Sequence, residues 1–344
     1  MAIVLNQVTG TAGNAGVVKP GVDTFYNRTL LTRLLPALVH AQLGDSKPFG
    51  KKQGNKMKFR RWKSLAVDEV PTPLTEGDPG AGQQVEYEEY EVTIAHYGRW
   101  LAITDEVDML VEDPVLTEFA LILGEQAGLT VDRVYREVMN GGTAFYRMAA
   151  NVAGARNTVN AKISSTALEI ALRTLRRSNV KKWTKGISAS TGVGTLPVRS
   201  AYWAICHPDL LRDLEALPDF VHVSKYASQT GIDPNEVGAW KDIRILCSTN
   251  ARVWRSSGAA VGATGLLSTD ATSVDVYSFL IVGQNAYGKC SIGSDNARNI
   301  RKGFTEGGIA NPLEQVASSG WSVWTAAVRL NEEALYRIEC GVTA

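Results

Sequence analysis

The 344-residue sequence predicts an α+β fold, and three observations support this class. Residues 46–104 hold two strand-like runs on either side of a connector rich in Pro and Gly, as a long β-hairpin does. Residues 113–142 carry the pattern of one long helix. From about residue 163 onward, helical and strand-like segments alternate, which indicates a mixed domain.

Composition and charge exclude several protein classes. The chain has 36 Lys and Arg against 35 Asp and Glu, so a net charge of +1 argues against a protein that coats nucleic acid. A hydrophobic content of 44% is sufficient for a large core. The start of the chain does not have the pattern of a signal peptide, and no apolar run is long enough to span a membrane. We therefore expect no membrane partner.

Residues 1–45 are expected to form an N-terminal arm with a helix. Residues 1–25 show no strong periodicity, whereas the leucines between Phe25 and Leu43 recur at the spacing of an amphipathic helix. Pro36 interrupts that run, so we expect a kink or a break there. A helix that faces the core of its own chain and a helix that docks on a neighbouring chain would both have this pattern.

Residues 46–104 are predicted to form an extended hairpin with one basic and one acidic strand. The run from Lys47 to Lys63 holds eight basic residues and no acid, interleaved with Met57, Phe59 and Trp62. The second run, from Val85 to Thr104, carries its acids in its first half. The charged residues of interest are Lys51, Lys52, Lys56, Lys58, Arg60 and Arg61 on the first run, and Glu86, Glu88, Glu89 and Glu91 on the second.

Three explanations for this charge arrangement remain open. The opposite charges could pair across the hairpin, which would stabilise it only slightly. Alternatively, because an isolated two-stranded ribbon has little core, the hairpin could lie over a partner of complementary charge and shape. The third is a basic patch for nucleic acid at Lys51–Lys63, which the adjacent glutamates would oppose.

The long helix is predicted to start at Asp113-Pro114 and to end at Asn140-Gly141-Gly142. About 27 residues at 1.5 Å each span roughly 40 Å, enough to cross a domain. Gly124 and Gly128 indicate close packing or a bend in its middle. Its predicted apolar stripe consists of Val115, Phe119, Ile122, Val131, Val134, Tyr135 and Val138.

The remaining chain is predicted to contain one further helix, a short helix and several strands. A capping box at Thr166–Glu169 predicts a helix over residues 167–178. Residues 255–272 are rich in Gly, Ala, Ser and Thr and are predicted to be a surface loop. Strands are predicted at residues 201–206, around 243–246, and at 274–282, 320–328 and 334–339, with the short helix after His207-Pro208.

Few residues suggest chemistry, and we expect no catalytic, cofactor-binding or metal-binding residue and no cofactor. HExxH, GxSxG and Walker motifs are absent from the sequence, and its four cysteines lack metal-binding spacing. Cys206 and His207 are neighbours, but adjacent strand residues point to opposite faces. Cys206 is therefore interpreted as a buried strand residue, with a thiol-dependent hydrolase kept as an alternative.

Several short segments together resemble one known family. They are Tyr26–Leu31, Leu74–Gly77, Ala201–Pro208, Glu236–Gly238, Gly283–Gly288, Asn311–Gln315 and Gly320–Trp324. Their order and spacing resemble those of Hong Kong 97-type major capsid proteins of tailed bacteriophages, and most closely the N-four-type family. The resemblance covers about residue 20 to the end. Ser322, where that family often has Lys, and an insertion at 255–272 depart from its pattern.

The resemblance implies a domain organisation for the chain. It implies an N-terminal arm at 1–45, an extended loop at 46–104 that reaches over a neighbouring subunit, and a peripheral domain with a spine helix at 105–160. It also implies an axial domain at 161–282 and a C-terminal return to the peripheral domain at 283–344. The charged hairpin residues then become expected intersubunit contacts, since a ring of copies joins unlike surfaces.

The resemblance further implies a structural function without catalysis. The chain is expected to form hexamers and pentamers of an icosahedral head that encloses double-stranded DNA without sequence-specific binding. Expected partners are a separate scaffolding protein, a portal and a cement or decoration protein, and the chain is expected in the virion after synthesis in the bacterial cytoplasm. The shell of an encapsulin-like nanocompartment, which shares this fold, is the main alternative.

Overall fold

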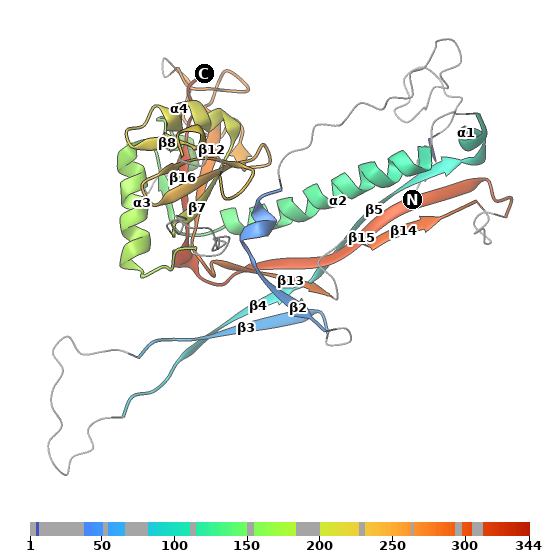
Figure 1. The fold of residues 1–344 in the computed structure, drawn as a ribbon, viewed down its shortest axis with the longest axis horizontal. Helices are drawn as coiled ribbons and strands as arrows, with labels where there is room; N and C mark the ends of the chain where they lie inside the picture. Colours follow the sequence, from blue (N-terminus) through green and yellow to red (C-terminus); the bar gives the residue numbers. More distant parts are fainter. Residues whose placement is uncertain are drawn as a thin grey trace, which may run out of the picture.

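The computed structural model describes residues 5–6, 38–50, 54–65, 82–110, 115–149, 155–183, 200–226, 231–262, 265–292, 298–304 and 312–344. Figure 1 shows three parts, which we name the lobe, the limb and the ribbon. The lobe is built on an eight-stranded sheet, the limb on a six-stranded sheet and a long helix, and the ribbon consists of two strands. The predicted α+β class is confirmed.

The lobe sheet follows the order β6-β16-β12-β7-β10-β9-β8, with β11 paired to β12. Its central strands are buried along their whole length, because the side chains of β12 and β16 are covered on both faces. The strands are β6 (Phe145–Arg147), β7 (Tyr202–Cys206), β8 (Phe220–His222), β9 (Glu236–Trp240), β10 (Ile243–Cys247), β11 (Val253–Trp254), β12 (Val276–Val282) and β16 (Leu335–Cys340).

One amphipathic helix and a short one belong to the lobe. Helix α3 (Ser165–Arg177) buries Leu168, Leu172 and Leu175 in the lobe core. Its N-cap is Ser164, whose side chain accepts a hydrogen bond from the Ala167 amide, so the capping box predicted two residues later is wrong. The short elements are η2 (Arg156–Thr158), η3 (Pro208–Leu210), α4 (Leu211–Glu215), η4 (Val223–Lys225) and η5 (Glu332–Ala334).

The limb sheet follows the order β1-β5-β15-β13-β2, with β14 paired to β15. Strand β15 is the central strand of this sheet, because it pairs with β5, β13 and β14. The strands are β1 (Leu5–Asn6), β2 (Asp45–Phe49), β5 (Ala95–Thr104), β13 (Tyr287–Ile292), β14 (Arg298–Lys302) and β15 (Val316–Arg329). The helical elements are η1 (His40–Leu43), α1 (Asp105–Leu110) and α2 (Val115–Asn140).

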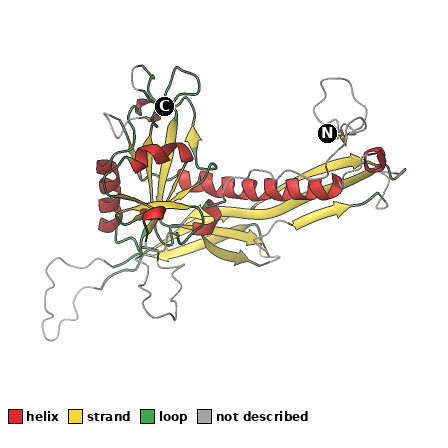
Figure 2. Cartoon of the chain, turned by 45° about the horizontal axis from the view of Figure 1, so that its top comes forward, coloured by secondary structure: helices red, strands yellow, loops and turns green. Residues whose placement is uncertain are grey.

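Helix α2 lies along one face of the limb sheet and runs toward the lobe (Figure 2). The predicted long helix is confirmed, although its predicted cap at 113–114 lies outside the described residues. The predicted apolar stripe is partly wrong: Ile122 is 40% exposed, whereas the neighbouring Leu123 is buried against Trp321 and Val323. The sheet below the helix selects this face, and the helix sequence alone did not reveal it.

The ribbon is shorter than the predicted hairpin. It pairs β3 (Lys56–Trp62) with β4 (Tyr87–Thr93) as a separate two-stranded sheet. The acidic run continues past the buried Ile94 into β5, which joins the limb sheet, and the basic run starts in β2, which pairs with β13. The expectation of one two-stranded arm over both whole runs is therefore wrong. The start of the basic run pairs with β13 and the end of the acidic run pairs with β15, so these parts belong to the limb sheet.

The other predicted strands agree with the structure within a few residues at their ends, and β15 starts earlier than predicted, at Val316. In the described residues, 255–272 form mostly loop with isolated bridges. The leucine-rich run of the arm lies outside the described residues up to 37, and its end forms η1. Among the described helices, none has the length and apolar character needed to cross a bilayer.

Candidate functional site

The two faces of the ribbon have different surroundings. Strand alternation places Met57 and Phe59 on one face, where they pack with Val92 against Cys290 and Ala326 of the limb sheet. The other face carries the more exposed side chains of β3 and β4. The apolar face therefore anchors the base of the ribbon, and the opposite face is exposed in the described part of the chain.

Opposite charges pair across the ribbon within one chain. The register places Lys58 opposite Glu91 and Arg60 opposite Glu89. The shortest distances are 2.6 Å from Lys56 Nζ to Glu91 Oε1 and 2.6 Å from Arg60 Nη2 to Glu89 Oε1. Nearer the free end, Arg61 lies 2.7 Å from Glu88 and Lys63 lies 3.0 Å from Glu86. The alternative of cross-strand pairing is thus confirmed for these residues.

The pairing also affects the titration of these carboxyl groups. A hydrogen bond from Lys56 lowers the pKa of Glu91, and one from Arg60 lowers the pKa of Glu89. The Tyr90 hydroxyl and Arg61 together lower the pKa of Glu88. All three groups are solvent-exposed, so this pairing adds little to stability. The glutamates nonetheless remain charged at neutral pH.

Two predicted site residues, Lys51 and Lys52, lie outside the described residues. The others are brought together on the ribbon, with Glu86 directly before β4. A basic patch for nucleic acid is not favoured there, because Lys56, Arg60, Arg61 and Lys63 each have a glutamate partner in the same chain.

The ribbon ends in an exposed aromatic pair. Trp62 is 60% exposed and Tyr87 is 49% exposed, and their rings meet edge to face with centroids 5.3 Å apart. The Arg60 guanidinium lies over the Tyr87 ring at 4.4 Å. Aromatic side chains with arginine are common at protein interfaces. In the sequence, Trp62 indicates a strand but not an exposed aromatic pair.

A further contact region joins the arm, α2 and the lobe. His40 Nδ1 lies 2.8 Å from the buried carboxylate of Asp132, which also accepts hydrogen bonds from the Ala41 amide and Asn250. Burial alone would raise the pKa of Asp132, but the hydrogen bond and charge of His40 outweigh it and lower the pKa. This cluster fixes the last residues of the arm to α2, and no spacing in the sequence indicated it.

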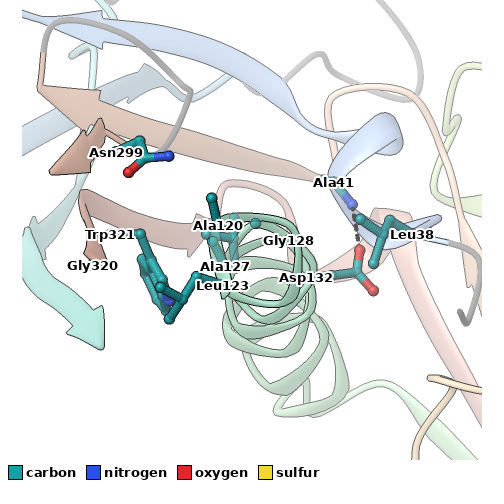
Figure 3. A pocket seen from close by; sticks show the side chains of 12 residues that line it. Leu38, Ala41, Ala120, Leu123, Ala127, Gly128, Asp132, Asn299, Gly320 and Trp321 are labelled. Atoms are coloured by element: carbon teal, nitrogen blue, oxygen red, sulfur yellow. Dashed lines mark hydrogen bonds between the residues drawn. The ribbon is translucent and has the colours of Figure 1, made fainter. Parts of the chain in front are cut away.

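A groove of about 370 Å³ lies beside this cluster, between α2 and the strand that carries Trp321 (Figure 3). A β-carbon added to Gly128 would come within 2.9 Å of Leu38, so this glycine allows the close packing that the sequence indicated. At Gly124, no atom of the described residues lies within 4 Å of the corresponding position. The groove is lined mainly by apolar side chains, with Asp132 and Asn299 as its polar members.

The Cys206 alternative receives no support from the site geometry. Cys206 is fully buried between neighbouring strands, and its hydrogen bond with Cys247 and its burial raise the pKa of the thiol. His207 does not face it as a base but caps η3, where its ring accepts from the Asp209 amide. In the described parts of the chain, no cluster of three or more His, Cys, Asp or Glu could hold a metal.

Comparisons with known proteins agree with this architecture. A family model described as phage capsid protein matches residues 87–338. The capsid of Ralstonia phage GP4 is similar at a TM-score of 0.65 and 11% identity, covering 98% of this chain and 99% of that chain. The cyanophage Pam1 capsid asymmetric unit is similar at 0.64 and 11%, covering 96% and 100%. The capsid of cyanophage P-SCSP1u is similar at 0.63 and 12%, covering 93% of both chains. No curated protein matches the sequence.

Proposed function

The chain belongs to the phage capsid protein family, and from this premise we propose how its parts build a shell. It is a major capsid protein with the Hong Kong 97-like fold, a structural subunit of the virion capsid and not an enzyme. It assembles with copies of itself. The nanocompartment alternative is not favoured, since the matching family and the similar structures are phage capsids.

We propose that the copies form the hexamers and pentamers of an icosahedral head that encloses the double-stranded DNA of a tailed phage. The observation that carries this proposal is the family match over residues 87–338, which includes one strand of the ribbon, most of the limb and nearly all of the lobe. Enclosure requires no sequence-specific DNA contact, and a net charge of +1 is compatible with that.

In this proposal the parts of the molecule are domains of a capsid subunit. The arm comprises residues 1–45, the extended loop 46–104 with the ribbon as its projecting part, and the peripheral domain 105–160 with α2 as the spine helix. Most of the lobe provides the axial domain at 161–282. Residues 283–344 return to the limb through β13, β14 and β15, after which β16 pairs with β12 and β6 in the lobe sheet.

We propose that the exposed face and end of the ribbon contact a neighbouring subunit. Three features support this. Among the described residues, the ribbon packs on the limb sheet through apolar side chains at its base. Its aromatic end is exposed, and its outer face carries an ordered row of charges. Because those charges already pair within the chain, the neighbour would meet a nearly balanced charged surface. The residues of this proposed contact are Lys51, Lys52, Lys56, Lys58, Arg60, Glu89 and Glu91, together with Arg61, Glu86 and Glu88 at the free end of the ribbon.

Membership in the family supports the proposal of further partners. We expect a separate scaffolding protein and a portal during assembly, a cement or decoration protein on the shell, and synthesis in the bacterial host cytoplasm. Co-purification of such proteins with immature particles would test these partners one by one.

Electron microscopy of particles purified from the native source tests the proposal as a whole. We expect icosahedral heads that contain DNA and carry tails, with this chain as the most abundant protein. Shells made of this chain that lack both DNA and a tail would contradict the proposal and favour the nanocompartment.

A further inference from the structure

The end of the limb farthest from the lobe exposes an unusual amount of apolar side chain. Among the large hydrophobic side chains of the described residues, Met109 at 82% and Leu313 at 75% are the most exposed. Met109 lies on α1, and Leu313 lies in the turn before β15. The Asp105 amide donates a 2.9 Å hydrogen bond to the Gln315 carbonyl, so the two segments adjoin. We call residues 105–109 and 312–315 the distal tip.

The distal tip is anchored by a small buried apolar cluster. Val107 is fully buried in a small cluster with Ile103 and Ala317, against which Phe119 and Phe304 pack. Because α1 turns Val107 inward, Glu106, Asp108 and Met109 remain exposed, and Glu314 is exposed beside Leu313. The tip therefore exposes Met109 and Leu313 on the same two segments as three acidic side chains.

A basic and aromatic surface lies on the limb sheet, and its charge is opposite to that of the distal tip. Asn299 of β14 faces the groove beside α2 (Figure 3), so its neighbours Arg298 and Ile300 project from the opposite face. On that face a shallow hollow of about 320 Å³ is lined by Trp100, Ile300 and Lys302. Trp100 is 56% exposed and Ile300 is 39% exposed. Gly98 and Gly320 also line this hollow, which we call the sheet hollow.

The charges of these two surfaces have no ion-pair partner among the described residues. No salt bridge within the described part of the chain involves Glu106, Asp108 or Glu314 on the tip, and none involves Arg298 or Lys302 beside the hollow. This contrasts with the ribbon, whose charges pair within the chain. Unpaired charge next to exposed apolar surface is the pattern of a surface that meets a partner.

We propose that the distal tip of one copy docks into the sheet hollow of a second copy. Met109 and Leu313 would pack against Trp100 and Ile300, while Glu106 and Asp108 face Arg298 and Lys302. The two surfaces differ and are both exposed within one chain, so the contact is heterologous and can be repeated around a closed ring. This inference rests on the proposed function and assigns a second contact between subunits, separate from the ribbon.

A simpler explanation accounts for only half of these observations. Charged residues on an edge strand such as β14 discourage unwanted strand pairing, which would explain Arg298 and Lys302. It does not explain why two large apolar side chains are strongly exposed on the adjoining segments of the tip, which also carry exposed acids. A partner with an apolar and basic surface explains both.

Charge and apolar variants of the full chain test the contact through assembly. We expect M109D and K302E each to lower particle yield by at least about ten-fold, as the loss of one buried apolar side chain or ion pair implies. The thermal unfolding of the unassembled subunit should stay unchanged. The swap E106K/D108K/R298E/K302E should restore assembly, because it re-creates opposite charges with inverted sign. Normal yields from M109D and K302E, or a swap that assembles no better than K302E, would overturn the proposal.

A disulfide gives a readout independent of yield. The variant M109C/I300C, treated with a mild oxidant during assembly, should give covalent multimers on a non-reducing gel, whereas M109C or I300C alone should not form ladders. Monomers only, or a bond within one chain, would overturn the proposal. If the wild-type chain forms no particles, the proposed function fails, whereas wild-type particles without the crosslink exclude only this contact.

Discussion

The lobe and the ribbon show two opposite ways of using β-strands. In the lobe, β12 lies between β7 and β16, and every one of its side chains is buried. In the ribbon, β3 and β4 pair only with each other among the described strands, and all of their side chains are intermediate or exposed. The lobe is therefore stabilised by its own core, whereas the ribbon has a large surface with little core beneath it.

This difference indicates which residues serve folding and which serve assembly. Substitutions in the lobe should unfold the subunit and lower assembly only as a consequence. Substitutions on the outer face of the ribbon should leave the subunit folded and act on assembly directly. The stability of the unassembled subunit and the particle yield therefore report on different parts of the molecule.

The largest loss of stability is expected from Phe279→Ala in the centre of β12. Phe279 is fully buried in the lobe core, and such truncations cost about 3–5 kcal/mol. The matched control is Trp62→Ala, which removes an exposed aromatic ring and should change stability by less than about 0.5 kcal/mol. Urea unfolding measures both. Equal losses would mean that the ribbon contributes to the fold as the lobe does.

A loss of about 3 kcal/mol is expected from Glu339→Gln, because it removes the charge of a buried ion cluster. Glu339 is fully buried and contacts Arg147, Arg156 and Arg337 at 2.8–2.9 Å. Burial raises the pKa of Glu339, but hydrogen bonds from Arg156 and Arg147 outweigh it and lower the pKa. The control is Glu89→Gln on the ribbon. A Glu339→Gln subunit as stable as wild type would show that the buried arginines do not require a charged partner for folding.

A smaller, pH-dependent loss is expected at the arm cluster. The folded pKa of Asp132 is lowered, so its contribution is present above the unfolded pKa of about 3.9 and is lost as pH falls further. Asp132→Asn should therefore lower the urea midpoint at pH 7, and the difference from wild type should shrink at about pH 3. An equal difference at both pH values would exclude the carboxylate charge as the cause.

The smallest effect on stability, and a large one on assembly, is expected from the reversal Lys56→Glu, Lys58→Glu and Arg60→Glu. The exposed pairs of the ribbon contribute little to folding, but their pattern forms the proposed contact surface. A compensated variant that adds Glu89→Lys and Glu91→Lys restores pairing within the ribbon. It should still assemble poorly, as seen by electron microscopy. Full recovery of assembly in the compensated variant would show that these charges serve only to pair within the chain.

Local patterns predicted much of this fold, and long-range pairing explains what they missed. The spacing of apolar residues and the stop at Asn140 were sufficient to predict α2, and alternation was sufficient for β12 and β16. The division of the acidic run at Ile94 could not be predicted, because β4 and β5 have the same strand propensity. They differ only in their partners, since β5 pairs with β15 from the far end of the chain.

The candidate site shows the same limit. The opposite charges of the two hairpin strands were visible in the sequence, but their pairing depends on the register that places Lys58 opposite Glu91. Asp132, the partner of His40, and Arg147 and Arg156, two of the partners of Glu339, come from distant segments, so no sequence motif indicates these clusters. The exposure of Met109 follows from the packing of Val107 on α1, which a single sequence does not display.

The central claim is that the ribbon serves a neighbouring subunit, and a cryo-electron microscopy map of the assembled particle tests it most directly. The account predicts that the outer face of β3 and β4, with Trp62 and Tyr87, lies against an adjacent copy around closed rings. A map in which these side chains face solvent or the subunit's own lobe would contradict it.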